Sequence, residues 1–181
     1  MSVVHQLRLH SLLGFGVLCL DLYCEFFEKK LKMFFLQLIL STVLLIIAVV
    51  IHALILDFTI RFLKKHGPDI FIRTRQMWRA SMLLIGVLSV FGSHIIQIWI
   101  WAVFYYFFTE INIFEDALYF STSTYTTVGF GDVVLDEKWR LISSFQSANG
   151  FILFGWSTAF IFELMTQLYR NEQIKRTDEK L

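Results

Sequence analysis

Three long apolar stretches separated by polar segments dominate the pattern of the chain. They run from Phe34 to Leu56, from about Ala80 to Phe108, and from Leu141 to Met165, and the last is interrupted only by Glu163. A bilayer core of about 30 Å requires about 20 mostly apolar residues in a helix. The pattern therefore predicts an all-α membrane protein with three membrane-spanning helices.

An earlier apolar segment, Ser11–Phe27, is a weaker candidate for a span. It contains Asp21 and Glu25, and each charge at a helix centre costs about 3 kcal/mol of insertion free energy. The alternatives are a signal peptide, an amphipathic surface segment, or a leader upstream of a functional start at Met33. The sequence leaves the status of residues 1–33 open among them.

The segment between the first predicted span, residues 34–60, and the second is basic. Residues 61–79 contain Arg61, Lys64, Lys65, Arg73, Arg75 and Arg79. Short basic loops stay on the cytoplasmic side, so the C-terminal tail, residues 167–181, is expected there too. Gly67 and Pro68 are predicted to end the first helix. The residues after them form either a short interfacial helix or a loop that only fixes the topology.

Composition agrees with a membrane location. Of the 181 residues, 56% are hydrophobic and 17% are charged, whereas about a quarter of the residues of a soluble domain are charged. The net charge of +1 gives no basis for nucleic-acid binding. Cys19 and Cys24 lack metal-ligand spacing. The expected partner is a lipid bilayer, in a multi-pass protein of the cell membrane without a cofactor.

The segment between the second and third spans is the most informative part of the chain. Asn112 and Glu115 suit a capping box, and a helix is predicted from Glu115 to Tyr125. This helix is too short to cross a bilayer, so the segment must enter the membrane and return on the outer side. Irregular backbone is tolerated at that depth only inside protein or along a water-filled path. The helix is followed by Thr126-Thr127-Val128-Gly129-Phe130-Gly131-Asp132.

These seven residues resemble the filter motif TTVGYGD of the potassium-channel pore family, and they depart from it at Phe130. The order of span, short helix, motif and span resembles that family over residues 80–166. The resemblance implies a potassium-selective channel, built as a homotetramer from an outer helix, a re-entrant pore helix with its filter, and an inner helix. Residues 34–60 would then be an additional N-terminal span. The motif loop would be extracellular or periplasmic, and no enzyme activity is implied.

The same resemblance assigns roles to individual residues. The backbone carbonyls of Thr127, Val128, Gly129 and Phe130 would replace the hydration shell of potassium, with the Thr127 hydroxyl at the innermost ring and Gly131 completing the filter. Carbonyls that all face one way require positive φ at alternate residues, which is easy for Gly129 and Gly131. The expected filter supports are Thr126, Asp132, Ser123 and Tyr119.

Departures from the family motif keep two alternatives open. Phe130 lacks the hydroxyl of the usual Tyr, and Ser123 stands where some family members carry a Glu that pairs with Asp132. A cation channel of weaker selectivity is therefore the first alternative. The second is a membrane enzyme or transporter subunit that uses His52, His94 or Glu163, although paired acids and a nucleophile with its base are missing from the pattern.

The third span is expected to line the cavity below the filter. Polar residues would form a wet cavity, and aromatic residues would form a constriction below it. The two sets are Ser143, Ser144, Gln146, Ser147 and Asn149, then Phe151, Phe154, Phe160 and Phe162. Gly150 and Gly155 are candidate gate hinges or sites of close helix packing. Glu163 forms either a carboxylate ring at the inner mouth or a contact at the head-group level.

Several polar residues lie inside the first two spans. His94, Gln97 and Trp101 share one helix face, which is expected to pack against the first span or the pore unit because intramembrane polar groups face protein. A pH sensor at His94 is an open alternative. His52 and Asp57 are interpreted as an interfacial pair. The sequence shows no voltage sensor or ligand-sensing domain, so the gating stimulus stays open.

Overall fold

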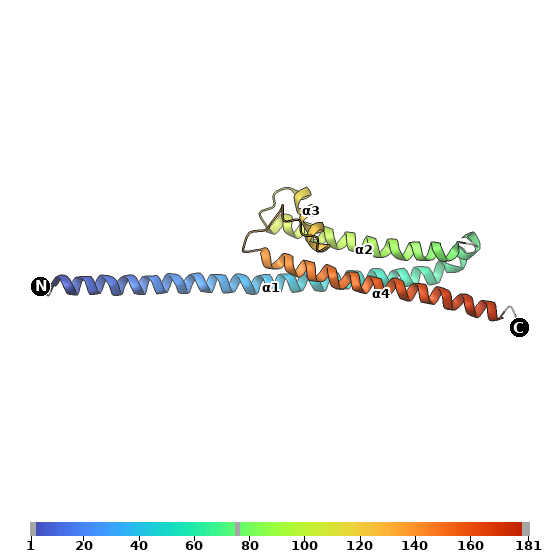
Figure 1. The fold of residues 1–181 in the computed structure, drawn as a ribbon, viewed down its shortest axis with the longest axis horizontal. Coiled ribbons are helices and arrows are strands. Elements are labelled where there is room, and N and C mark those ends of the chain that lie inside the picture. Colours follow the sequence, from blue (N-terminus) through green and yellow to red (C-terminus); the bar gives the residue numbers. More distant parts are fainter. Residues whose placement is uncertain (1–2, 75–76, 179–181) are drawn as a thin grey trace. The chain divides into compact units, whose positions relative to one another are not determined.

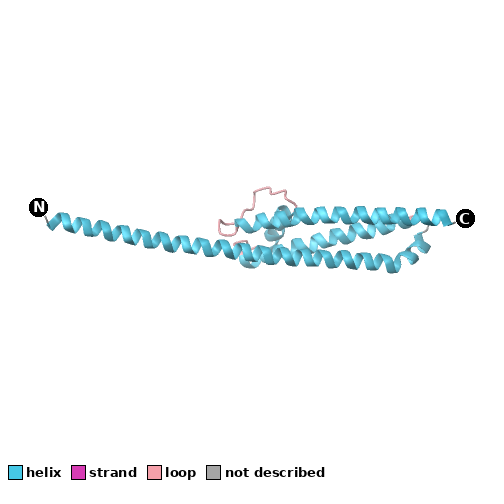
Figure 2. Cartoon of the chain, turned by 90° about the horizontal axis from the view of Figure 1, so that it is seen from below, coloured by secondary structure: helices cyan, strands magenta, loops and turns pink. Residues whose placement is uncertain are grey.

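The computed structural model describes residues 3–74 and 77–178, with the side chains of residues 23, 25–67 and 77–170. This part of the chain consists of four helices, α1 (Val3–Thr74), α2 (Trp78–Phe108), α3 (Phe114–Tyr125) and α4 (Arg140–Asp178) (Figure 1). Within the described residues, loops rather than strands connect α2, α3 and α4 (Figure 2). The predicted all-α fold is confirmed.

The chain divides into two units, Met1–Leu40 and Ser41–Leu181. The first unit is helical over its described residues. Exposed ion pairs at a spacing of four residues, which suits a helix, join Lys29 to Glu25 at 2.9 Å and Lys32 to Glu28 at 2.6 Å. The second unit contains the rest of α1, the other three helices and the predicted motif.

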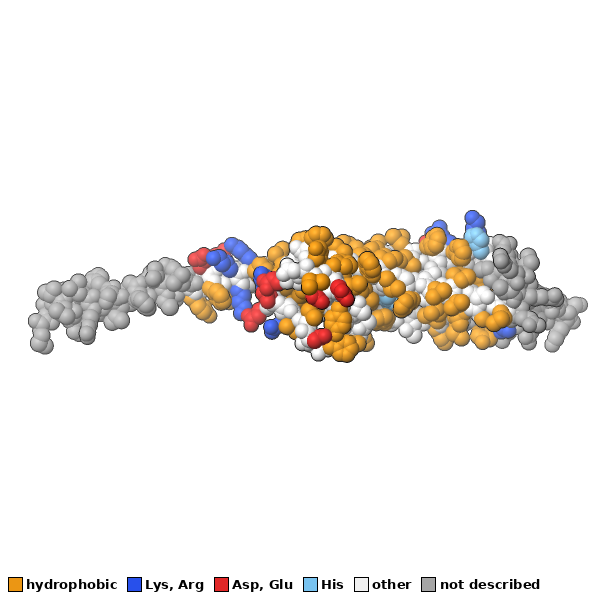
Figure 3. Space-filling view, turned by 90° about the horizontal axis from the view of Figure 1, so that it is seen from above, with side chains coloured by type: hydrophobic (Ala, Val, Ile, Leu, Met, Phe, Trp, Pro, Cys, Tyr) orange, Lys and Arg blue, Asp and Glu red, His pale blue; other side chains and the backbone are white. Residues whose placement is uncertain are grey.

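Among the described residues, three helices are long and apolar enough to cross a membrane. The qualifying segments are Glu25–Gly67, Trp78–Phe108 and Arg140–Arg170, and each contains one of the predicted spans. Large apolar side chains are exposed along them, and Figure 3 shows such side chains spread over the helical part. Water-soluble proteins rarely expose apolar surface on this scale, whereas lipid solvates it, so these helices support a membrane protein.

The prediction that the first helix ends at Gly67 and Pro68 is wrong, because α1 continues to Thr74. Proline removes one backbone hydrogen bond, but its fixed φ near −65° is itself helical. Losing one bond bends a helix without having to end it, and the end of α1 turns toward the start of α2 in Figure 1. Residues 69–74 are therefore helical rather than a loop, and their position in a membrane interface stays a prediction.

In the second unit, α1, α2 and α4 bury residues at spacings of three and four, which places each set on one helix face. The sets are Ala48, His52, Leu56, Thr59 and Leu63 on α1, Val90, His94, Gln97, Trp101 and Tyr105 on α2, and Ile142, Gln146, Asn149, Leu153 and Ser157 on α4. At one end, Leu63, Met82 and Leu168 form an apolar cluster. Gly86 permits close packing there, because a Cβ on it would lie 2.5 Å from a methyl of Leu164.

Candidate functional site

The short helix α3 carries the motif loop at its C-terminal end. It begins at Phe114, and its N-cap is Ile113 without a side-chain capping bond. The predicted cap at Asn112 is therefore wrong by one residue, because the extended backbone that opens the helix falls on Ile113. Glu115 and Asp116 lie in the first turn, where negative charge interacts favourably with the helix dipole.

Backbone φ is positive at every second residue of the motif loop. The values are 63° at Thr127, 56° at Gly129 and 81° at Gly131. The two glycines adopt this conformation without steric cost, whereas a residue with a Cβ is strained by about 1–2 kcal/mol. The expected alternation thus extends to Thr127, two residues closer to α3 than Gly129.

Ser123, on the last turn of α3, binds the amides of the loop. Its carbonyl accepts hydrogen bonds from the amides of Val128 at 3.0 Å and Gly129 at 3.2 Å, and its hydroxyl accepts one from the amide of Phe130 at 3.4 Å. In a trans peptide unit the C=O points opposite to the N–H. The carbonyls of Thr127, Val128 and Gly129, which belong to these peptide units, are therefore directed away from α3.

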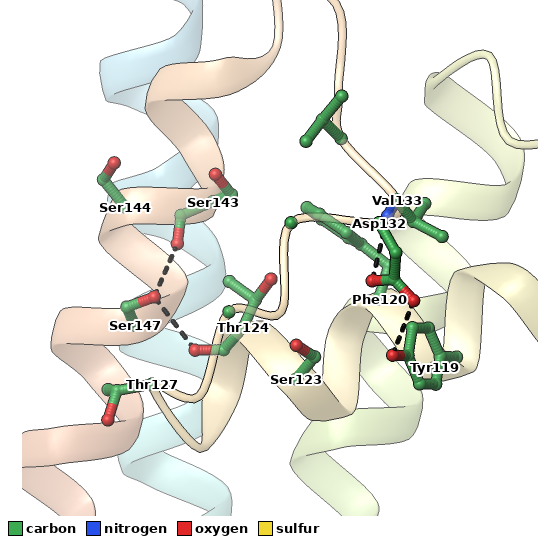
Figure 4. Close-up of a pocket in the computed structure, with 13 residues that line it drawn as sticks. Tyr119, Phe120, Ser123, Thr124, Thr127, Asp132, Val133, Ser143, Ser144 and Ser147 are labelled. Carbon is green, nitrogen blue, oxygen red and sulfur yellow. Dashed lines mark hydrogen bonds between the residues drawn. The ribbon is translucent and has the colours of Figure 1, made fainter.

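Tyr119 and Asp132 connect α3 to the outer end of the loop. The Tyr119 hydroxyl donates a hydrogen bond of 2.8 Å to the Asp132 carboxylate (Figure 4), and the Tyr119 ring stacks on that of Phe130 with 6.4 Å between centroids. The hydrogen bond from Tyr119 lowers the pKa of Asp132, and the same bond raises the pKa of Tyr119. The outer end of the loop is thus held by a tyrosine and a carboxylate.

Two of the predicted supports, Ser123 and Tyr119, contact the loop directly, and Asp132 completes the link to Tyr119. The fourth, Thr126, behaves differently, since its hydroxyl donates back to the carbonyls of Thr122 at 2.8 Å and Ser123 at 3.3 Å. That contact ends α3 and does not reach the loop. The functional roles of all four residues stay predictions.

A pocket of about 410 Å³ lies between α3, the loop and the first turns of α4 (Figure 4). Polar side chains from three elements line it, including Thr124, Thr127 and Ser144. The Ser147 hydroxyl donates a hydrogen bond of 2.9 Å to the carbonyl of Thr124, so α4 is tied to the last turn of α3. On the side of the pocket, the loop is not covered by other parts of the same chain.

The prediction that Gln146 and Asn149 line a wet cavity is wrong, because both side chains are buried inside the chain. Gln146 accepts a hydrogen bond of 2.8 Å from the Tyr105 hydroxyl and donates to the carbonyl and the hydroxyl of Ser121 at 3.1 and 2.9 Å. Buried polar groups in a membrane helix face protein partners. The Gln146 side chain therefore joins α2, α3 and α4, whereas Ser144 is exposed.

The two candidate hinge glycines of α4 have different surroundings. A Cβ on Gly150 would lie 2.1 Å from the carbonyl oxygen of Tyr125, whereas a Cβ on Gly155 would meet nothing within 4 Å. Gly150 is therefore required for α4 to approach the end of α3. A hinge at either residue stays a prediction.

His52 lies at the centre of a buried polar cluster and is not paired with Asp57. Its Nδ1 is 2.8 Å from the Ser93 hydroxyl and 3.2 Å from Nε2 of Gln97. Asp57 instead accepts from Arg61 at 2.8 Å. Residues five apart on a helix do not face each other, which is why the predicted pair does not form.

His94 belongs to the same cluster and joins three helices. Its Nδ1 is 2.9 Å from the Tyr125 hydroxyl, and its Nε2 is 2.9 Å from the Ser157 hydroxyl. Nε2 of His52 is 3.2 Å from that same hydroxyl. The predicted packing of the His94 face against the first span or the pore unit is confirmed, and the face contacts both. We name the set of His52, Ser93, His94, Gln97, Tyr125 and Ser157 the histidine cluster.

The sequence pattern singled out His94 and Gln97 but missed Tyr125 and Ser157. Both are buried, and a hydroxyl is too common in helices to signal a partner by itself. Glu163, the candidate for an inner-mouth ring, is exposed and accepts a hydrogen bond of 2.8 Å from Gln167 one turn later. Among the described residues, no group of three or more His, Cys, Asp or Glu could hold a metal ion.

No curated protein and no solved structure matched the chain. Residues 93–167 match the family model described as an ion channel. The matched range begins on α2 at Ser93, contains all of α3 and the motif loop, and ends on α4. The residues that build this site are thus similar to the ion-channel family, and this similarity supports an ion channel in a membrane.

Proposed function

We propose that four copies of this chain form a potassium-selective channel that conducts passively through a central pore. In each copy α2 is the outer helix, α3 the pore helix, α4 the inner helix, and α1 contributes the additional span. Residues 127–131 form the filter, and potassium is the transported ion. The channel uses no cofactor and performs no covalent chemistry.

The direction of the loop carbonyls carries this proposal. The amides of Val128, Gly129 and Phe130 all turn toward Ser123, so the preceding carbonyls point together to the opposite side. A row of carbonyl oxygens is what replaces the hydration shell of an ion in a potassium filter. The proposal adds the carbonyl of Phe130 and the hydroxyl of Thr127 to that row.

In this proposal one loop supplies a quarter of a ring, so four copies are needed to complete it. Closed cyclic symmetry is the usual way for identical chains to complete such a ring. Val128 is 55% and Phe130 is 71% exposed in the single chain, an unusual state for apolar residues beside a buried helix end. Neighbouring copies would cover them. The C-terminal, partially negative end of α3 would then favour a cation in the cavity.

The basic residues of the α1–α2 region set the proposed orientation. Such residues stay in the cytoplasm, so the motif loop faces the extracellular or periplasmic side and the C-terminus is cytoplasmic. A cation channel of weaker selectivity is a second candidate, favoured by one observation. The Phe130 side chain carries no hydroxyl, and its ring contact is a stack on the exposed Tyr119.

Ion flux through purified protein in liposomes tests the proposal. We expect potassium flux that barium blocks, and a reversal potential that follows the potassium gradient when sodium replaces potassium on one side. A tetramer is expected in native mass spectrometry of the same preparation. Equal permeation of sodium and potassium would select the weakly selective channel.

A non-channel membrane enzyme or transporter subunit predicts a different outcome. Such a protein would give no barium-sensitive potassium flux, and it would not have to assemble as a tetramer. Absence of flux together with a monomer in detergent would overturn the proposed function. Flux that saturates at low potassium and depends on a second solute would instead indicate a transporter.

A further inference from the structure

The histidine cluster is a closed hydrogen-bonded network in the middle of the helical bundle. All six of its side chains are buried, and they come from α1, α2, α3 and α4. Each donor hydrogen has to find an acceptor, since an unmatched polar group in this environment is destabilising by about 1–3 kcal/mol. The directions of the hydrogen bonds can therefore be assigned from the network.

The contact with Gln97 favours one protonation state of His52. Its Nδ1 faces the amide nitrogen of Gln97 at 3.2 Å, and an amide nitrogen can only donate. Nδ1 of His52 is therefore the unprotonated acceptor, and the hydrogen lies on Nε2, where it is donated to the Ser157 hydroxyl oxygen at 3.2 Å. Protonation of Nδ1 would set two donors against each other.

His94 differs because both of its ring nitrogens face hydroxyl groups. The Tyr125 hydroxyl donates to the side-chain carbonyl of Gln97 at 2.8 Å, so its oxygen accepts from Nδ1 of His94 at 2.9 Å. The other nitrogen, Nε2, lies 2.9 Å from the Ser157 hydroxyl. A hydroxyl serves as donor or acceptor depending on its rotation.

The Ser157 hydroxyl thus allows two states of His94 with the same heavy-atom positions. When Ser157 donates to Nε2, the ring is neutral. When Ser157 donates to the carbonyl of Leu153, which lies at 2.8 Å, its oxygen accepts from both histidines and the His94 ring is doubly protonated. Every donor hydrogen of the network has an acceptor in both states, and the states differ by one proton and one hydroxyl rotation.

Few ionisable groups face His94 from the packed elements. On α1 the facing group is His52, with 5.3 Å between ring centroids, and on α3 it is Tyr125. Across α4 the neighbours are Ser157 and the ring of Phe154. The nearest charged residues on these helices are Asp57 and Glu163, about 8–9 Å along the axis from His52 and Ser157.

We propose that His94 is a buried proton-binding site that regulates conduction. Protonation places a positive charge one tyrosine side chain away from the C-terminal end of α3, whose partial negative charge would otherwise favour a cation. At about 10 Å and an effective dielectric constant of 20, a unit charge lowers cation occupancy roughly tenfold. The consequence for conduction rests on the proposed function, whereas the proton site does not.

Nitrogen-15 NMR of the full-length protein in liposomes, with labelled histidine imidazoles, tests the site directly. As the pH is lowered from about 8 to below 5, past the window in which histidines usually titrate, we expect His94 to change from the Nδ1–H form to the doubly protonated form. His52 stays in the Nε2–H form. The His94 signals disappear in His94→Gln, and His66→Gln, which alters a half-buried histidine near the carbonyl of Phe62, leaves them unchanged.

Potassium flux measured on the same liposomes, with equal pH on both sides, separates the two claims. We expect a roughly tenfold fall in flux on acidification that His94→Gln abolishes and His66→Gln retains. Ser157→Ala removes the acceptor for Nε2, so the doubly protonated form should appear only at lower pH, which gives a second variant if His94→Gln does not fold.

A His94 ring that keeps one neutral form throughout the titration overturns the proton site. A pH dependence of flux that persists in His94→Gln overturns its role in conduction. A normal His94 titration in protein without flux at any pH would reject the proposed channel while supporting the proton site.

Discussion

The backbone of Gly150 on α4 lies against the carbonyl oxygen of Tyr125 at the end of α3, so that a Cβ on Gly150 would be 2.1 Å from that oxygen. Gly150→Ala is therefore expected to push α4 away from α3 and to destabilise the protein by about 1–3 kcal/mol, as overpacking usually does. The melting temperature in detergent measures this effect.

Gly155→Ala is the matched comparison in the same helix. Its added methyl meets no atom of the chain within 4 Å, and alanine favours helix over glycine by about 1 kcal/mol. We expect an unchanged or higher melting temperature. If both variants melt at the temperature of the wild-type protein, Gly150 is not a packing residue, and its hinge role becomes the better explanation.

Gly129→Ala should abolish conduction while leaving membrane insertion intact. The residue has φ of 56° and no atom within 4 Å of a built Cβ, so the effect is backbone strain of about 1–2 kcal/mol and not a clash. Relief of that strain would rotate the Gly129 peptide, so that its carbonyl no longer points in the same direction as those of Thr127 and Val128. Flux in liposomes is the measurement, and Gly92→Ala, which also has open space and lies in α2, is the control that should conduct normally.

Tyr119→Phe should return the pKa of Asp132 toward its ordinary value, because the hydrogen bond that lowers this pKa is removed. A carboxyl group whose pKa is lowered on folding stabilises the folded state at any pH above its ordinary pKa. This contribution is lost as the pH falls through the lowered pKa of the folded state. Carbon-13 NMR of labelled aspartate follows the titration.

The structure predicts that Tyr106→Phe leaves the Asp132 titration where it is, since the Tyr106 ring contacts Phe107 and Phe114 and not the carboxylate. Identical titration curves for wild-type protein and Tyr119→Phe would contradict the role given to the Tyr119 hydroxyl.

Gln146→Leu should destabilise the protein by about 1–3 kcal/mol, because the buried Tyr105 hydroxyl loses the oxygen to which it donates and Ser121 loses the donor from α4. Adding Tyr105→Phe should recover part of this loss, since contacting residues are not additive. Thermal melts of the two single variants and the double variant measure it. Ser144→Ala, at an exposed position of α4, is expected to be neutral, and strict additivity would argue against a shared network.

The spans and the loop motif could be predicted from the residues because each depends on local pattern. The length of an apolar segment decides whether a helix can cross a bilayer. Alternating glycines in the motif predict alternating backbone conformations. The helix end at Pro68 could not be predicted, since one lost hydrogen bond competes with the many bonds of α1. The cap of α3 was misplaced by one residue for a similar reason, because several local choices differ by little free energy.

What the sequence by itself determined is the all-helical membrane class, the three apolar spans and the short helix before Thr126–Asp132. Only the tertiary structure decided which polar side chains meet. Gln146 turned out to face Tyr105 and Ser121, and His52 to share the Ser157 hydroxyl with His94. Periodicity tells which residues share a face of one helix. The rotation and register of that face against another helix depend on packing among residues far apart in the chain.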